Sequence, residues 1–208
     1  LNKKVKELHQ FNISIRDVVF HNIDLQNGGA WKPLNCSPQH RVAIVIPYRN
    51  RYQHLITLLY FLIPMLKRQM IHFRIFIAEQ VNITLLILYS SVFLKFAVYG
   101  DDIFNKGRLM NAAFLEAKKL FHFDCVIFHD VDLVPEDDRN VYSCPWQPKH
   151  LSVAIDEMNY KSVFIKILKY ELLVGGVLNM RKEHFEMVNG YSNNYWGWGG
   201  EDDDMAYR

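Results

Sequence analysis

The sequence has few cysteines, little net charge and no glycine-rich phosphate loop of the P-loop type. Its three cysteines match no zinc-binding spacing. A net charge near +2 over 208 residues gives no basis for a nucleic-acid footprint, so no nucleic-acid partner is expected. No Ser/His/Asp or Cys/His spacing suggests a covalent nucleophile, and no internal repeat is visible. These absences argue against a zinc finger, a polyanion-binding protein and a P-loop enzyme.

The composition is that of one globular domain. Half of the residues are hydrophobic and 14% are aromatic, which excludes disorder, and 208 residues suffice for a single sizeable core. Residues 1–40 are polar and irregular, so we expect a lead-in that wraps the domain rather than core, and an ordered domain over residues 41–208. The chain begins at Leu1 without a methionine or a signal-like apolar segment, so it is expected to be part of a longer protein.

Modification motifs indicate a secretory route. The tripeptides that begin at Asn12, Asn35 and Asn82 are acceptors for N-glycosylation if the chain enters that pathway. In that compartment the three cysteines predict one disulfide and one leftover thiol.

Alternating strand and helix patterns predict an α/β fold. Apolar runs predict buried strands at residues 42–46, 73–78 and 125–128. Pro47 is expected to stop the first strand, and Pro64 to kink or split a buried helix over residues 53–67. Asn105 can cap a helix whose apolar residues recur at three and four. This order predicts a mostly parallel sheet flanked by helices.

Residues 83–99 form an apolar stretch of seventeen residues with Lys95 as its only charge, close to the lower limit for crossing a bilayer. A membrane span here would place the strand before it and the helix after it on opposite sides of a membrane. We therefore interpret residues 81–100 as an apolar insertion.

Two aspartates follow the third predicted strand. Asp130-Val131-Asp132 stands where open α/β sheets bind ligands, and paired carboxylates suit Mg²⁺ or Mn²⁺. The motif is a candidate site for a metal ion and a diphosphate. Arg49 and Arg51, after the first strand, could grip phosphate oxygens, although ordinary surface arginine is the commoner explanation.

The segment 194–204 combines two tryptophans, three glycines and four consecutive acids. Flat aromatic faces beside carboxylates suit a sugar, which offers a C–H face and hydroxyl groups. A solvated acidic turn or a buried tryptophan pair would each explain only part of it. Together with the strand-end aspartates, the segment indicates transfer of a sugar from a nucleotide donor, with a carboxylate accepting the hydroxyl proton.

These motifs occur in the order seen in the β-1,4-galactosyltransferase family, which the chain resembles from about Lys32 to its last residue. The motifs that carry the resemblance are Ile46-Pro-Tyr-Arg-Asn-Arg51, Phe104-Asn105, Asp130-Val-Asp-Leu133, Gly175-Gly176, Asn189-Gly190 and Trp196-Gly-Trp-Gly-Gly-Glu-Asp-Asp-Asp204. The resemblance implies a GT-A fold, Mn²⁺, and inverting transfer from a UDP-sugar to a terminal GlcNAc of a glycan. It also implies a Golgi type II membrane protein with a lumenal catalytic domain and an anchor outside this chain.

The resemblance assigns roles to individual positions. Residues similar to the family's donor site are Pro47, Tyr48, Arg49, Arg51, Phe104, Lys106, Asp130, Val131, Leu173, Gly176, Trp198 and Glu201. Those similar to acceptor contacts are Tyr195, Asp202 and Asp203. Asp202 matches the catalytic base and Asp132 the metal-binding aspartate, with the other metal ligands expected beyond Arg208. Cys125 and Cys144 match a family disulfide, and Cys36 matches half of another.

Three positions depart from the family pattern. Leu173 stands where galactose-using members carry a tyrosine that crowds a C2 N-acetyl group, which favours UDP-GalNAc over UDP-Gal as donor. UDP-Gal remains the alternative, since Leu173 could simply pack. Lys106 replaces an arginine and Glu157 falls where some members have lysine, so weaker donor binding is expected.

Residues 81–100 and 162–169 exceed the family spacing. A translated intron is our hypothesis for the first, and transcript sequencing tests it. Because metal ligands and a lid are expected beyond Arg208, these 208 residues alone are predicted to be weakly active or inactive. A sugar-binding relative without turnover is the alternative.

Overall fold

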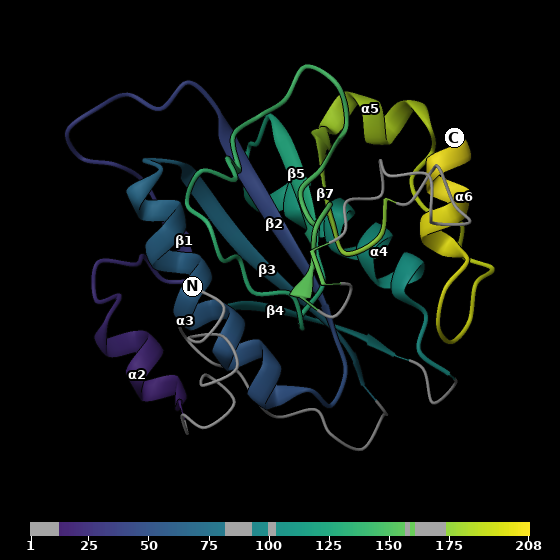
Figure 1. Cartoon of the computed structure of the whole chain (residues 1–208), viewed down its shortest axis with the longest axis horizontal. Helices are drawn as coiled ribbons and strands as arrows, with labels where there is room; N and C mark the ends of the chain where they lie inside the picture. The colour runs from purple at the N-terminus through teal and green to yellow at the C-terminus, as the bar shows by residue number, and fades with distance from the viewer. Residues whose placement is uncertain (1–12, 82–92, 100–102, 157–158, 161–173) are drawn as a thin grey trace.

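The computed structural model describes residues 13–81, 93–99, 103–156, 159–160 and 174–208, and it has helices packed on both faces of one twisted sheet (Figure 1). The helices are α2 (Ile15–Phe20), α3 (Tyr52–Arg68), α4 (Lys106–Leu120), α5 (Lys182–Met187) and α6 (Glu201–Tyr207). The strands are β1 (Ala30–Trp31), β2 (Arg41–Tyr48), β3 (His72–Val81), β4 (Leu94–Tyr99), β5 (Cys125–His129), β6 (Lys149–His150) and β7 (Val177–Arg181).

The sheet is parallel in its centre and antiparallel at its margins. Its order is β1-β3-β2-β5-β7-β6, and β4 pairs with β3 as well. Strands β5, β2, β3 and β4 run parallel, whereas β1, β7 and β6 pair antiparallel with their neighbours. The α/β prediction is confirmed, and the parallel strand ends that meet at one edge create the candidate site.

Side-chain alternation along β2 divides the core between two layers. Ile44 and Ile46 belong to the cluster that packs against α3, while Ala43 and Val45 belong to the cluster that packs against α4 and α5. All four side chains are fully buried. A strand buried on both faces explains why this stretch is continuously apolar rather than alternating.

The expected strand stop at Pro47 and the expected split at Pro64 were wrong, whereas a kink at Pro64 stays a prediction. Strand β2 continues through Pro47 to Tyr48, because pairing with β5 ends at Val45 and only the pairing with β3 continues beyond it. There the missing N–H of a proline is tolerated. Helix α3 likewise runs through Pro64 as one helix, because its apolar side buries eight residues against the sheet, including Leu62 and Leu66.

The lead-in contributes more than the wrapping that we expected. Val18 of α2 is completely buried in the core, and β1 adds a short edge strand to β3. Ser14 caps α2 through a reciprocal pair of hydrogen bonds with Asp17. The boundary at residue 40 remains a prediction, but the segment before it belongs to the packed domain.

The apolar stretch is described only in part. Residues 94–99 form β4, parallel to β3, and Phe93 is buried in the core. Residues 82–92 and the second excess segment, 162–169, lie outside the described residues. In the described part of the chain no helix combines the length and apolar character needed to span a bilayer.

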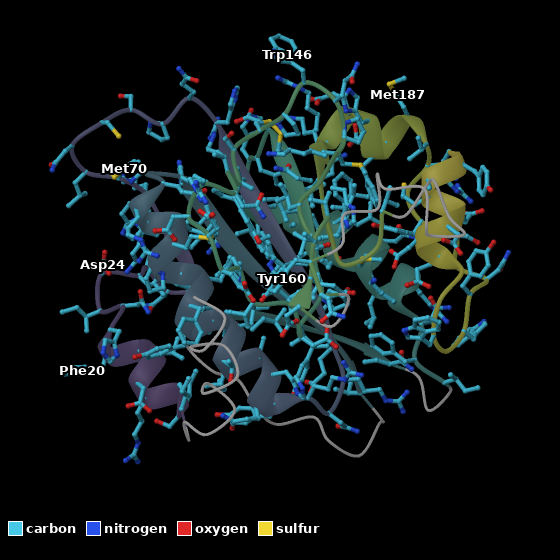
Figure 2. The ribbon with its side chains drawn as sticks, in the orientation of Figure 1. Phe20, Asp24, Met70, Trp146, Tyr160 and Met187 are labelled. Carbon is cyan, nitrogen blue, oxygen red and sulfur yellow. A yellow bond between two sulfur atoms is a disulfide. The ribbon has the colours of Figure 1, made fainter. Side chains whose placement is uncertain are left out.

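Three of the most exposed apolar side chains lie apart from one another. Figure 2 shows Phe20, Trp146 and Met187 at separate places around the rim of the molecule, and they are 77%, 85% and 81% exposed. Isolated exposed apolar residues are normal on protein surfaces. They give no case for a contiguous docking surface.

Candidate active site

The candidate site lies where the carboxyl ends of β2 and β5 meet the first turns of α4 and α6. The end of β2 and the loop after it carry predicted donor residues: Pro47 and Tyr48, in the strand, are buried, and Arg49, in the loop, is half-buried. Arg51 is exposed, and its Nη1 lies 2.5 Å from Asp132 Oδ2. The two loops that sequence analysis linked to a diphosphate are therefore in direct contact.

The Asp130–Asp132 motif is anchored by its backbone. The Asp130 N–H donates to the carbonyl of Gly176 at 2.9 Å, and the Val131 side chain is buried. Asp130 and Asp132 therefore point away from the core on either side of a fixed residue. The Asp132 side chain is 44% exposed and that of Asp130 27%, so Asp132 is the more accessible carboxylate.

Lys106 connects this motif to α6. Its Nζ lies 2.9 Å from Asp130 Oδ1, 3.0 Å from Asp202 Oδ2 and 3.5 Å from Glu201 Oε1. Asn105 places the lysine at the start of α4, because its side chain caps the helix by accepting from the Arg108 N–H at 2.8 Å. We refer to Lys106, Asp130, Glu201 and Asp202 as the charge cluster.

Burial and mutual attraction set the protonation of the charge cluster. Burial alone would lower the pKa of Lys106, but the charges of Asp130 and Asp202 outweigh it and raise that pKa. Burial raises the pKa of Asp130 to about 6 against the opposing attraction of Lys106. Burial, followed by the charge of Asp202, also raises the pKa of Glu201. One firmly protonated cation therefore lies among three acids.

The glycine- and tryptophan-rich segment packs beside this cluster. The Gly197 N–H donates to the carbonyl of the half-buried Phe104 at 2.8 Å, which joins the segment to the residue that the resemblance assigns to the donor site. Gly200 has φ +93° and precedes α6; a Cβ there would lie 2.5 Å from Tyr195 Cδ1. The tyrosine ring thus rests on a surface that only glycine can provide.

The two tryptophans face solvent. Trp198 is 101% exposed and Trp196 44%, so neither is a core residue. The alternative that this pair merely packs inside the domain is therefore wrong. Asp203 is also exposed, next to Asp202 in the first turn of α6.

Sequence reasoning missed several partners in the site. It placed Lys106 in the donor site, which stays a prediction, but it did not predict that the ammonium lies between carboxylates. It also assigned nothing to Gly175, whose Cβ would lie 2.8 Å from Asp202 Oδ2, or to the His150 that contacts Gly175. No local signal marks these contacts. Leu173 and Glu157 lie outside the described residues.

A divalent cation has one suitable carboxylate here. Asp132 offers an exposed hard oxygen ligand, whereas both oxygens of Asp130 are held by Lys106. Within the described ranges, no group of three or more His, Cys, Asp or Glu side chains could hold a metal ion. A single carboxylate fits the type of site in which substrate phosphate oxygens complete the coordination.

The predicted disulfide is present. Cys125, at the start of β5, is joined to Cys144, and Cys36 is an exposed free thiol. The bridge fixes the loop after the Asp130–Asp132 motif to the strand that precedes it.

The arrangement is that of a GT-A glycosyltransferase. The structure is similar to a Drosophila β-1,4-galactosyltransferase 7 mutant solved with manganese, UDP-Gal and xylobiose, with a TM-score of 0.62 and 30% identity. That likeness covers 81% of this chain and 60% of the other. The two proteins therefore share sequence as well as fold.

Sequence comparison identifies the family. A profile described as the N-terminal region of glycosyl transferase group 7 matches residues 2–145, and one described as the N-terminal domain of galactosyltransferase matches residues 149–208. The chain belongs to the β-1,4-galactosyltransferase family. Mouse β-1,4-galactosyltransferase 1 is 40% identical over 97% of this chain and 45% of its own length. The β-N-acetyl-D-glucosaminide β-1,4-N-acetylglucosaminyl-transferase of Lymnaea stagnalis is 45% identical over 89% of this chain and 33% of its own length. The chain thus spans less than half the length of these relatives.

Proposed function

We propose that the chain carries much of the catalytic domain of an inverting β-1,4-glycosyltransferase that uses a UDP-sugar, Mn²⁺ and a GlcNAc-terminated acceptor. The observation that supports this most is the charge cluster, in which the strand-end aspartate and the α6 aspartate share one lysine. Donor and acceptor chemistry would thereby meet within a few ångströms. The family and the manganese, UDP-Gal and xylobiose in the solved relative support the same reading.

The donor would lie against the loop after β2 and the end of β5. Arg51 would exchange its contact with Asp132 for the phosphate oxygens of UDP, because guanidinium forks match them bidentately. Arg49, in the same loop, would add a second fork. When bound at Asp132, a divalent cation would balance the negative charge that develops on the departing diphosphate.

Asp202 would act as the base. Its carboxylate would accept the proton of the acceptor 4-hydroxyl as that oxygen bonds to the anomeric carbon and the bond to the UDP oxygen breaks. One displacement inverts the anomeric centre, so no enzyme nucleophile is needed. Lys106, whose Nζ lies 3.0 Å from Asp202 Oδ2, would orient the carboxylate. Tyr195 and Asp203 would hold the acceptor sugar.

For the donor we propose UDP-GalNAc, on the sequence argument that Leu173 leaves room for a C2 N-acetyl group. UDP-Gal is the alternative, favoured by the galactosyltransferases among the relatives. The Lymnaea relative is named for transfer of N-acetylglucosamine, another sugar with a C2 N-acetyl group. Competition between UDP-GalNAc and UDP-Gal, repeated with Leu173→Tyr, tests this: loss of GalNAc transfer with gain of galactose transfer supports the proposal, and an unchanged preference contradicts it.

The proposed location is the Golgi lumen, in a type II membrane protein whose anchor lies outside this chain. The disulfide supports a lumenal domain, because such bonds persist in oxidising compartments. Protease protection of the chain in intact Golgi vesicles would support the assignment. Digestion without detergent would contradict it.

The test of activity compares two substitutions on one helix. Asp202→Asn should lower kcat by at least about 100-fold, since it removes the proposed base. Asp204→Asn is the matched control, because Asp204 pairs with Arg208 rather than with Lys106 and should retain activity. Both are assayed with Mn²⁺, UDP-sugars and a GlcNAc acceptor, in the 208 residues and in the longest natural chain that contains them. Full activity of Asp202→Asn would refute the assignment of the base.

A sugar-binding relative without turnover remains the second candidate. It is favoured by Trp198, whose ring faces solvent and could bind a sugar without any reaction. Binding of GlcNAc-terminated glycans without Mn²⁺-dependent transfer in the longest natural chain would support it.

A further inference from the structure

Two side chains contact the backbone of the turn at Gly175 and Gly176. His150 Nε2 lies 2.6 Å from the Gly175 carbonyl oxygen, and Ser152 Oγ donates to the same oxygen at 3.0 Å. Ser152 Oγ also accepts from the Val177 N–H at 2.9 Å. The Gly175 carbonyl therefore has two side-chain partners. The backbone N–H of Val177, the first residue of β7, binds one of those partners, Ser152.

The hydrogen-bond roles follow from chemistry. A carbonyl oxygen can only accept, so His150 Nε2 carries the proton that it donates to Gly175. Burial lowers the pKa of His150, which favours the neutral ring. Ser152 Oγ accepts from the Val177 N–H and lies 2.8 Å from His150 Nε2, and with the histidine proton on Nε2 the serine hydroxyl donates to the Gly175 carbonyl.

The other side of the turn faces α6. A Cβ at Gly175 would lie 2.8 Å from Asp202 Oδ2 and 3.3 Å from its carboxyl carbon. The Asp202 carboxylate thus rests against the bare Cα of Gly175, and Lys106 Nζ lies 3.0 Å from the same oxygen, Oδ2. A Cβ at Gly176 would meet Ser152 Oγ at 2.5 Å, so only glycine fits beside the serine.

We infer that His150 and Ser152 are positioning residues, which fix the Gly175 carbonyl and through that glycine the place of the Asp202 carboxylate. This inference rests on the proposed function, in which Asp202 is the base. Neither side chain belongs to the donor, acceptor or metal groups assigned above. They would act by fixing the position of the Asp202 carboxylate, because a displacement of a reacting group by about 1 Å can lower the rate by about 100-fold.

The experiment uses pairs of substitutions in the longest natural chain that contains this sequence. His150→Leu and Ser152→Ala remove donors to Gly175, and each should lower kcat by about 10- to 100-fold while the KM for the UDP-sugar changes less than about 2-fold. His150→Gln should recover most of the loss, because its amide N–H can reach the place of imidazole Nε2. A residue that only supported folding would not show this recovery.

Gly175→Ala tests the same contact without touching the hydrogen bonds. Its φ lies outside the left-handed region, and the atom that a Cβ would meet is the end of the Asp202 side chain, so the variant should fold. It should lower kcat to a similar degree with an unchanged thermal midpoint. His122→Gln, on an exposed histidine, is the control that should leave kcat unchanged.

The outcomes separate the two claims. If Asp202→Asn abolishes transfer but His150→Leu, Ser152→Ala and Gly175→Ala keep full kcat, the positioning role is refuted and the proposed function stands. If His150→Gln is as impaired as His150→Leu, the hydrogen-bond argument is refuted. If Asp202→Asn retains full transfer, the proposed base is wrong and the inference falls with it.

Discussion

Replacing Lys106 by methionine should destabilise the fold strongly at neutral pH. The substitution keeps an unbranched side chain of similar length but removes the cation from Asp130, Glu201 and Asp202. The lysine side chain is only 13% exposed and its carboxylate partners 27%, 6% and 18%. Water therefore compensates little for the lost charge.

The expected magnitude follows from that burial. Removing one partner of a buried ion pair costs about 3–5 kcal/mol, and the residual exposure of Asp130 places Lys106→Met near about 3 kcal/mol. A domain has about 5–15 kcal/mol in all, so this is a large fraction. With a denaturant slope of about 2 kcal/mol per molar urea, the unfolding midpoint should fall by about 1.5 M.

The loss should shrink in mild acid. Burial already raises the pKa of Asp130 to about 6, and loss of the lysine raises it further. The folded variant then binds a proton that the unfolded chain, with a carboxyl pKa near 3.8, does not bind until lower pH. As pH rises through this interval, the free energy of unfolding of Lys106→Met therefore falls relative to that of the parent. The difference in stability between the two proteins is largest at neutral pH.

The assay is urea unfolding under non-reducing conditions near neutral pH and near pH 5. Lys106→Arg keeps the charge and should lose less than half as much stability. Lys118→Met is the matched control, because the pair of Lys118 with Glu186 is 44% and 42% exposed and should be worth less than about 1 kcal/mol. Equal losses for Lys106→Met and Lys118→Met, or a gap that does not change with pH, would refute the reasoning.

Three further predictions concern other parts of the fold. Burial lowers the pKa of His129 to about 4, while its unfolded value stays near 6.5. The free energy of unfolding should therefore fall by up to about 3 kcal/mol as pH drops through that interval. Urea unfolding at several pH values should show this dependence in the parent, and it should be absent in His129→Asn. Reduction of the bridge between Cys125 and Cys144, which are 19 residues apart, should cost about 3 kcal/mol, measured as the shift of the urea midpoint with dithiothreitol, and an unchanged midpoint would contradict it. Gly200→Ala should cost about 1–3 kcal/mol because of its φ of +93°, and should raise the acceptor KM by displacing Tyr195, whereas unchanged acceptor kinetics would show that the ring is not a contact.

Local patterns predicted the central elements well. The apolar runs identified β2, β3 and β5, and Asn105 marked the start of α4 because a side-chain cap is a local interaction. Pro47 and Pro64 were misread because their cost depends on neighbours that the local pattern does not show. A strand with one partner and a helix with a large buried face both tolerate proline.

The lead-in was underestimated for a related reason. Residues 13–31 look polar, yet Val18 and Ala30 are buried because a short helix and a two-residue strand fill places left open by α3 and β3. Isolated apolar residues in a polar stretch carry no periodic signal. Only packing shows that they belong to the core.

The sequence by itself determined the family, the kinds of chemical group in the site and the strands that deliver them, because motifs of this kind are read along the chain. The tertiary structure decided which groups touch. Lys106 contacts Asp202, 96 positions further along the chain, and Gly175, in the loop before β7, lies against the same carboxylate. Burial and distance arise only when those elements pack, and they bring one lysine within reach of three carboxylates.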